Sequence, residues 1–113
     1  MAGEGLRGGE ERPHLPRMTL DEFKALSDVS ELDQALQALW QDRNGNWDQA
    51  HDLAQAANNA QGDWVHAYLH RKEGDIGNAG YWYSRASQPR VSAGVLLEEE
   101  WDQIATTLLA SGD

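Results

Sequence analysis

Two histidines and a glutamate share one face of a predicted helix in the middle of the chain. His66, His70 and Glu73 follow one another at spacings of four and three, which in an α-helix places two imidazoles and one carboxylate along a single stripe. Zinc accepts two ring nitrogens and a carboxylate oxygen as ligands, with a fourth position left for water. The segment lacks the Glu that follows the first histidine in zinc proteases of the HExxH type. The same histidines would also serve as hydrogen-bonding groups inside a helix interface.

A related polar stripe lies 29 residues earlier in the chain. A shift of this length carries His66 and His70 onto Gln37 and Gln41, so two helices present side chains that donate and accept hydrogen bonds. If the helices stack, these side chains and Glu73 line one groove, and helical-repeat proteins often bind extended peptides along such a surface. We therefore predict a binding surface along this stripe, with a plain solvated face as the alternative.

Three consecutive aromatic residues extend this candidate surface. Tyr81, Trp82 and Tyr83 point about 100° apart on a helix, so they cannot all face one neighbour. Tyr83 falls on the inner face that Ala79 and Ala86 define, and Tyr81 lies opposite. We expect the last helix to cover Tyr81, with an exposed aromatic contact as the alternative. Tyr81 and Trp82 complete the set of candidate binding residues.

Other residues that could take part in a site carry a weaker signal. His51, close to Trp47 and Asp48, is expected to be a packing or capping residue rather than a base. Gly77 and Gly80 each cost up to about 1 kcal/mol within a helix, which indicates close approach of another helix or of a ligand. No residue is predicted to be catalytic, because the chain has no Cys and lacks both a phosphate-binding Gly loop and a G-x-S-x-G motif.

Apolar residues at helical spacing, separated by turn signals, predict six helices. Thr19 and Ser30 are expected to cap the first two, and Asp63 the fourth. Gly45 and Gly74 suit the left-handed residue that follows a helix, so each is expected to join two helices into an antiparallel hairpin. The first helix is expected to start at residue 20, and the others to span 31–43, 47–57, 64–73, 76–86 and 95–111.

The two predicted hairpins have matching sequences. The 29-residue shift superposes Gly45 on Gly74 and Ala50 on Ala79. One such hairpin cannot bury its own apolar face, so hairpins stack and a terminal helix closes the stack. The sequence therefore predicts an all-α fold of two tandem antiparallel helix hairpins over 19–113, with a short N-terminal helix and a C-terminal capping helix. Residues 1–18 are predicted to be a disordered tail.

Two resemblances accompany this pattern. Gly74, Ala79, Tyr83, Ala86 and Pro89 stand as in the second helix of tetratricopeptide repeats, so the hairpins resemble that family, although their period is shorter than its 34 residues. The chain also reads W-x-H-A-Y-L-H-R-x-E-G-D from residue 64 and N-A-x-Y-W-Y-x-R-A from residue 78. In this it resembles a family of short, uncharacterised bacterial proteins, which implies a helical fold and assigns no functional residue.

Composition limits the partners. Nineteen acidic and nine basic residues give a formal charge of −10, which repels nucleic acid and anionic membranes. Neither is expected as a partner, no cofactor is expected, and the location is predicted to be cytoplasmic. The predicted function is a non-catalytic module that binds a protein or peptide. The alternative is a small metal-dependent enzyme with its site at His66, His70 and Glu73.

Overall fold

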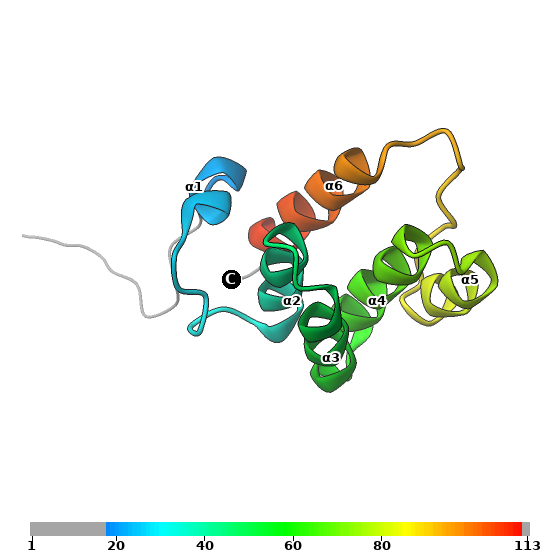
Figure 1. Ribbon diagram of the computed structural model, residues 1–113, viewed down its shortest axis with the longest axis horizontal. Helices are drawn as coiled ribbons and strands as arrows, with labels where there is room; N and C mark the ends of the chain where they lie inside the picture. The colour runs from blue at the N-terminus through cyan, green and yellow to red at the C-terminus, as the bar shows by residue number, and fades with distance from the viewer. Residues whose placement is uncertain (1–17, 112–113) are drawn as a thin grey trace, which may run out of the picture.

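The computed structural model describes residues 18–111, and this part of the chain forms six α-helices and no strand (Figure 1). The helices are α1 (Leu20–Ala25), α2 (Gln34–Arg43), α3 (Trp47–Ala57), α4 (Ala60–Lys72), α5 (Ile76–Arg85) and α6 (Leu97–Ala110). The predicted all-α class is confirmed. The tail predicted at 1–18 lies, apart from Met18, outside the described residues.

Two helix hairpins form the body of the structure, α2 with α3 and α4 with α5. Their turns have the same shape, because Gly45 and Gly74 adopt left-handed φ angles of +86° and +92°. In each turn the residue after the glycine donates its backbone N–H to a carbonyl four residues before that glycine, Asn46 to Gln41 and Asp75 to His70, both at 2.9 Å. A side chain would be strained at either glycine.

Three helices begin at different residues from those predicted, and α6 is the least displaced, since it begins at Leu97 and not at 95. The helix α2 starts at Gln34, not at 31, because residues before it form turns in which the Ser30 N–H donates to the Asp28 carboxylate at 2.9 Å. The helix α4 starts at Ala60, not at 64, because the Asn59 side chain accepts the Gly62 N–H at 2.8 Å. The N-cap is therefore Asn59, and the predicted cap Asp63 lies within the first turn, where its charge suits the helix dipole.

The two hairpins meet where α3 packs against α4, a contact called here the α3/α4 seam. At one end of the seam, a Cβ added to Gly62 would lie 2.6 Å from the Ala54 carbonyl oxygen and 2.7 Å from the Ala57 Cβ. At the other end, the Trp47 indole N–H donates to the Leu69 carbonyl at 3.1 Å. These contacts fix the spacing of the two helices at both ends.

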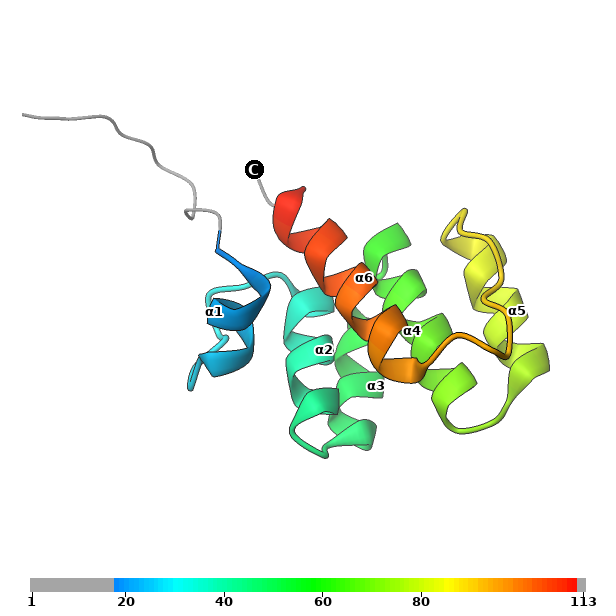
Figure 2. The same ribbon diagram turned by 90° about the horizontal axis from the view of Figure 1, so that it is seen from above.

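The last helix, α6, lies across α2 and α4, and α1 packs against α6 (Figures 1 and 2). The Trp101 ring of α6 is 3% exposed, stacks on Phe23 at a centroid distance of 5.8 Å and donates to the Leu39 carbonyl at 3.0 Å. The expectation that this helix covers Tyr81 is wrong. Tyr81 is 54% exposed, because α6 packs on the side of α4 rather than over the outward face of α5.

The helix glycines of α5 differ from each other. The Arg90 guanidinium lies against Gly80 where a Cβ would stand, so the close neighbour there is a side chain from the segment after α5 and not another helix. Nothing lies within 4 Å of a Cβ added to Gly77, so no other helix of the described structure approaches that position. Among the described residues, no helix is long and apolar enough to span a membrane.

Candidate functional site

Three histidines meet in the middle of the α3/α4 seam, and they are called here the histidine cluster: His51 from α3, and His66 and His70 from α4. Each offers a ring nitrogen, and these nitrogens all lie within 4.8 Å of one another. The arrangement follows from helix geometry. His66 and His70 are one turn apart on α4, and the antiparallel α3 brings His51 opposite them.

The rings of the cluster are in direct contact. The Nε2 atoms of His51 and His66 are 2.9 Å apart, a hydrogen-bond distance at which one ring must donate and the other accept. The His51 ring meets the His66 ring edge-on at a centroid distance of 4.5 Å, and the His66 and His70 rings stack at 4.8 Å. The cluster is therefore one connected group of imidazoles.

Two tryptophans enclose the cluster. The Trp47 ring stacks on His51 with centroids 5.1 Å apart, and the Trp82 ring of α5 stacks on His66 at 3.9 Å. Because Trp47 is also hydrogen-bonded to α4 and Trp82 belongs to α5, the rings are held from three helices. Rings packed on both sides lose most of their rotational freedom.

Glu73, the third predicted ligand, contacts the Nδ1 atom of the His70 ring. The His70 Nδ1 atom lies 2.7 Å from the Glu73 Oε2 atom, so we assign the proton to Nδ1, with the carboxylate accepting it. The Nε2 atom of His70 then carries a lone pair, and the Asn78 amide nitrogen is 3.4 Å away. The carboxylate thus sets the tautomer and the orientation of this ring.

The three histidines differ in how much of each side chain is exposed to solvent. His66 and His70 are only 2% and 7% exposed, whereas the His51 side chain is 25% exposed and forms the solvent edge of the cluster. Burial, with a smaller contribution from His51 and His70, lowers the pKa of His66 to about 4. His66 is therefore neutral at physiological pH, and its Nδ1 atom has no hydrogen-bond partner in the described structure.

Of the predicted polar stripe, only the part on α4 belongs to this cluster. The Gln37 amide donates to the Leu32 carbonyl at 2.7 Å, and the Gln41 side chain accepts from Asn46 at 2.8 Å. No hydrogen bond in the described structure joins either glutamine to the histidines. Because His66 is sealed between helices, it does not line an open groove.

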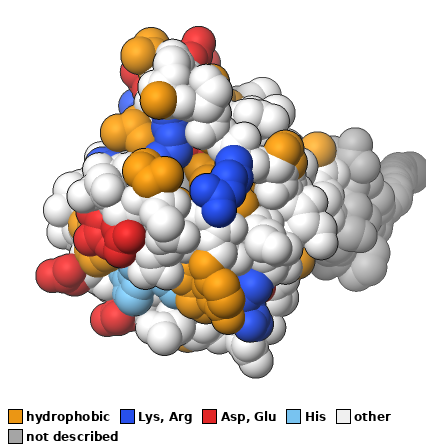
Figure 3. All heavy atoms as spheres, turned by 90° about the vertical axis from the view of Figure 1, so that its right-hand side faces the viewer, with side chains coloured by type: hydrophobic (Ala, Val, Ile, Leu, Met, Phe, Trp, Pro, Cys, Tyr) orange, Lys and Arg blue, Asp and Glu red, His pale blue; other side chains and the backbone are white. Residues whose placement is uncertain are grey.

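Tyr81 and Trp82 stand side by side at the far end of the molecule. Their rings meet edge-on with centroids 5.1 Å apart, and the Arg85 guanidinium lies 5.9 Å from the Tyr81 ring centroid and 5.2 Å from that of Trp82. Figure 3 views this end of the molecule, where hydrophobic and basic side chains lie beside a histidine that reaches the surface. The predicted aromatic pair is thus next to the histidine cluster, through the Trp82 contact with His66.

The sequence contains one indication that His51 faces α4. His51 stands four residues after Trp47, so both share the inner stripe of α3 that packs on α4. The sequence predicts His51 to be a packing or capping residue, and its ring does stack on Trp47 of the same helix. The other two imidazoles lie on α4, and only the packing of the two helices brings them to His51.

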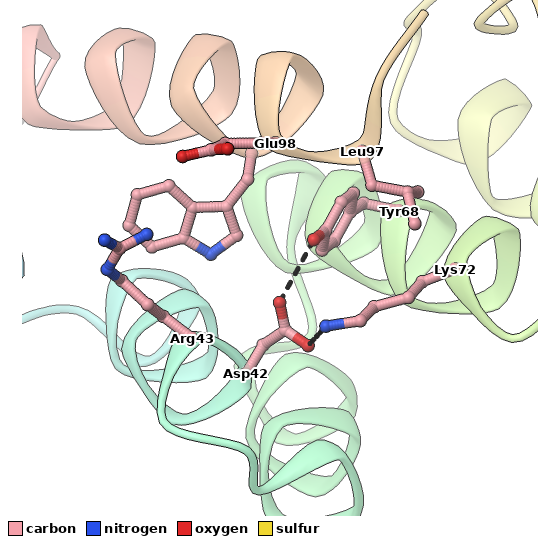
Figure 4. A pocket seen from close by; sticks show the side chains of 7 residues that line it. Asp42, Arg43, Tyr68, Lys72, Leu97 and Glu98 are labelled. Carbon is pink, nitrogen blue, oxygen red and sulfur yellow. Dashed lines mark hydrogen bonds and ion pairs between the residues drawn. The ribbon is translucent and has the colours of Figure 1, made fainter.

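Two further buried polar centres lie on the other side of α4. The Asp42 carboxylate accepts from the Tyr68 hydroxyl at 3.1 Å and from the Lys72 ammonium at 2.8 Å, at the floor of an open pocket of about 310 Å³ (Figure 4). The Glu100 carboxylate accepts from the Tyr83 hydroxyl and, at 2.9 Å, from the Arg71 guanidinium. Every charge in these groups has an opposite partner, which is typical of structural ion pairs.

Comparison with models of protein families, with curated proteins and with solved structures finds no match to this chain.

Proposed function

We propose that this domain is a non-catalytic interaction module whose contact surface is the outward face of α5, formed by Tyr81, Trp82 and Arg85. One observation carries the proposal. Tyr81 is 54% exposed and the Arg85 side chain 49% exposed, on the end helix of the second hairpin. Trp, Tyr and Arg are the residue types that contribute most binding energy in protein interfaces.

The side chains of this face are held by contacts with one another and with His66. Trp82 is anchored by its stack on the buried His66 ring, Tyr81 packs edge-on against Trp82, and the Arg85 guanidinium lies over both aromatic rings. The Arg85 guanidinium also donates to the Tyr81 hydroxyl at 3.3 Å. Side chains that are already ordered lose little conformational entropy on binding, which favours affinity.

Charge indicates the kind of partner. Arg85 is a cation beside the aromatic pair, and its Nε atom is 3.6 Å from the Asp63 carboxylate. Its exposed half leaves room for a second carboxylate. The partner is therefore a protein or peptide segment that lays an apolar side chain against Tyr81 and Trp82 and a carboxylate against Arg85.

A photo-crosslinking side chain at position 81 tests the proposal. The full chain carrying p-benzoylphenylalanine in place of Tyr81 is irradiated in cells that produce the protein naturally, and adducts are identified by mass spectrometry. We expect one dominant adduct, which Arg85→Glu abolishes while the melting temperature stays within about 2 °C, because exposed substitutions change stability little.

The same crosslinker at Gln103, an exposed residue on α6, is the matched control. An adduct formed equally from both positions, or one that persists in Arg85→Glu, would show that the outward face of α5 is not the contact surface. A synthetic peptide from the adduct that binds the wild type and not Arg85→Glu completes the test.

A further inference from the structure

The histidine cluster holds more imidazole nitrogens than its own hydrogen bonds use. Nitrogens of His51, His66 and His70 lie within 4.8 Å of one another. Within the described structure the only hydrogen bond between them is the 2.9 Å contact of the His51 and His66 Nε2 atoms. The His70 Nε2 atom is 3.4 Å from the Asn78 amide nitrogen, a long contact that leaves its lone pair available for a ligand.

The hydrogen bond to Glu73 prepares His70 to act as a ligand. A histidine that binds a metal usually donates its other ring N–H to a carboxylate or carbonyl, which fixes the ring and makes the free nitrogen more basic. The His70 Nδ1 contact with Glu73 at 2.7 Å has this form. On His51, the Nδ1 atom lies 4.0 Å from the Asp52 carboxylate, which is too far for a hydrogen bond.

The spacing of the His51 and His66 rings is close to that of two ligands in a metal site. Two ligand nitrogens on one tetrahedral zinc ion, each bonded at about 2.0–2.1 Å, are about 3.3 Å apart. The Nε2 atoms of His51 and His66 are 2.9 Å apart. Metal binding would require the donating ring to carry its proton on Nδ1 instead of Nε2, so that both Nε2 lone pairs face the ion. It would also separate the two atoms by a few tenths of an ångström, a shift that a small rotation of the more exposed His51 ring provides.

The chain offers one competing group at the same place. His70, Glu73 and Asp75 also have ligand atoms within 4.8 Å of one another. Asp75, however, caps α5 by accepting the Asn78 N–H at 3.3 Å, and both carboxylates are solvent-exposed. The three imidazoles are held in place by two helices and two tryptophans. Imidazole nitrogens are suitable ligands for zinc, nickel and copper, whereas magnesium and calcium prefer oxygen ligands.

We propose that His51, His66 and His70 bind one transition-metal dication of the zinc type, and that Glu73 is a positioning residue that orients the His70 ring. The acidic surface of the chain, at −10 overall, raises the local concentration of such a cation. The site joins the two hairpins across the α3/α4 seam. It shares Trp82 with the outward face of α5, but zinc binding and partner binding are measured in separate experiments, so the failure of one proposal is distinguishable from the failure of the other.

The test is zinc binding to the full chain after a chelator has removed all metal. Calorimetric titration with Zn²⁺ is expected to give one ion per chain and titration with Mg²⁺ no binding, because magnesium prefers oxygen ligands. One equivalent of zinc is expected to shift the ring NMR signals of all three cluster histidines. His51→Ala should weaken zinc binding by roughly 100-fold or more, and Glu73→Gln by roughly 10–100-fold.

Two controls keep the test decisive. His14→Ala removes the fourth histidine of the chain and should leave zinc affinity unchanged. Glu73 is exposed, so its substitution reports on the site even if His51→Ala alters the fold. The proposal is overturned if zinc leaves the three ring signals in place, if His51→Ala binds as tightly as wild type, or if Asp75→Asn weakens binding as much as His51→Ala.

Discussion

Removal of the Glu100 carboxylate should destabilise the domain more than any exposed substitution on α6. The Glu100 side chain is 2% exposed and accepts hydrogen bonds from Arg71 of α4 and Tyr83 of α5. The Arg71 side chain is only 9% exposed and would keep the Val95 and Ser92 carbonyls as its remaining partners. Glu100→Ala therefore leaves one buried cation and one buried hydroxyl without their acceptor.

The expected loss of unfolding free energy is about 3–5 kcal/mol, the usual effect of removing one partner of a buried ion pair. This is a large part of the roughly 5–15 kcal/mol that stabilises a typical domain. It corresponds to a fall in melting temperature of about 12 °C or more. Urea denaturation followed by circular dichroism measures the free energy, and thermal scans measure the temperature.

Glu98→Ala is the matched control for Glu100→Ala. Glu98 lies half a turn earlier on the same helix and is exposed, so its loss should change the free energy of unfolding by less than about 0.5 kcal/mol. If the loss arises because the Arg71 guanidinium is left without its carboxylate, replacing Arg71 and Glu100 together by Met should lower the free energy of unfolding less than Glu100→Met alone. A loss below about 1 kcal/mol for Glu100→Ala would refute the reasoning.

Three further predictions concern backbone packing and titration. Gly62→Ala should destabilise the domain by about 1–3 kcal/mol because its Cβ would overlap α3. Gly77→Ala should stabilise the domain by about 0.5–1 kcal/mol, because a Cβ at that position meets open space. Urea denaturation of both variants measures the two changes in the free energy of unfolding. Gly45→Ala and Gly74→Ala should each cost about 1–2 kcal/mol, since both glycines are left-handed, and clearly unequal losses would contradict a common turn shape. Burial raises the pKa of Glu100 above its ordinary value of 4.5, so its ionisation opposes folding, and the stability of the wild type relative to Glu100→Gln should fall as the pH rises from 4.5. Denaturation at a series of pH values checks this, and a flat or rising difference would contradict it.

Local features of the fold were predictable because their causes are local. Thr19 caps α1 as expected, and its hydroxyl accepts the Glu22 N–H at 3.1 Å. Gly45 and Gly74 end their helices in the left-handed conformation that the sequence indicated. The predicted start of α4 was wrong, because two nearby residues can each cap a helix. Asn59 and Asp63 are both good N-cap residues, and the choice of Asn59 lengthens α4 toward the close contact of Gly62 with α3.

The candidate site was only partly predictable. His66, His70 and Glu73 are neighbours on one helix, so their spacing alone placed them together. His51 joins them from 15 residues away, a distance along the chain over which helix periodicity carries no information about contact. Glu73, which the sequence predicts as a third ligand, is hydrogen-bonded to the Nδ1 atom of His70.

The amino-acid sequence by itself determined the helices, their turns and the pairing of neighbours into hairpins, because capping, glycine conformation and apolar spacing act within a few residues. Only the tertiary structure decided how the hairpins and α6 pack. That packing buried His66, left Tyr81 exposed and brought His51 into the cluster. The physical reason is that helix packing depends on the summed contacts of whole surfaces, among them the close contact of Gly62 with Ala54 and Ala57. No short stretch of sequence encodes that sum.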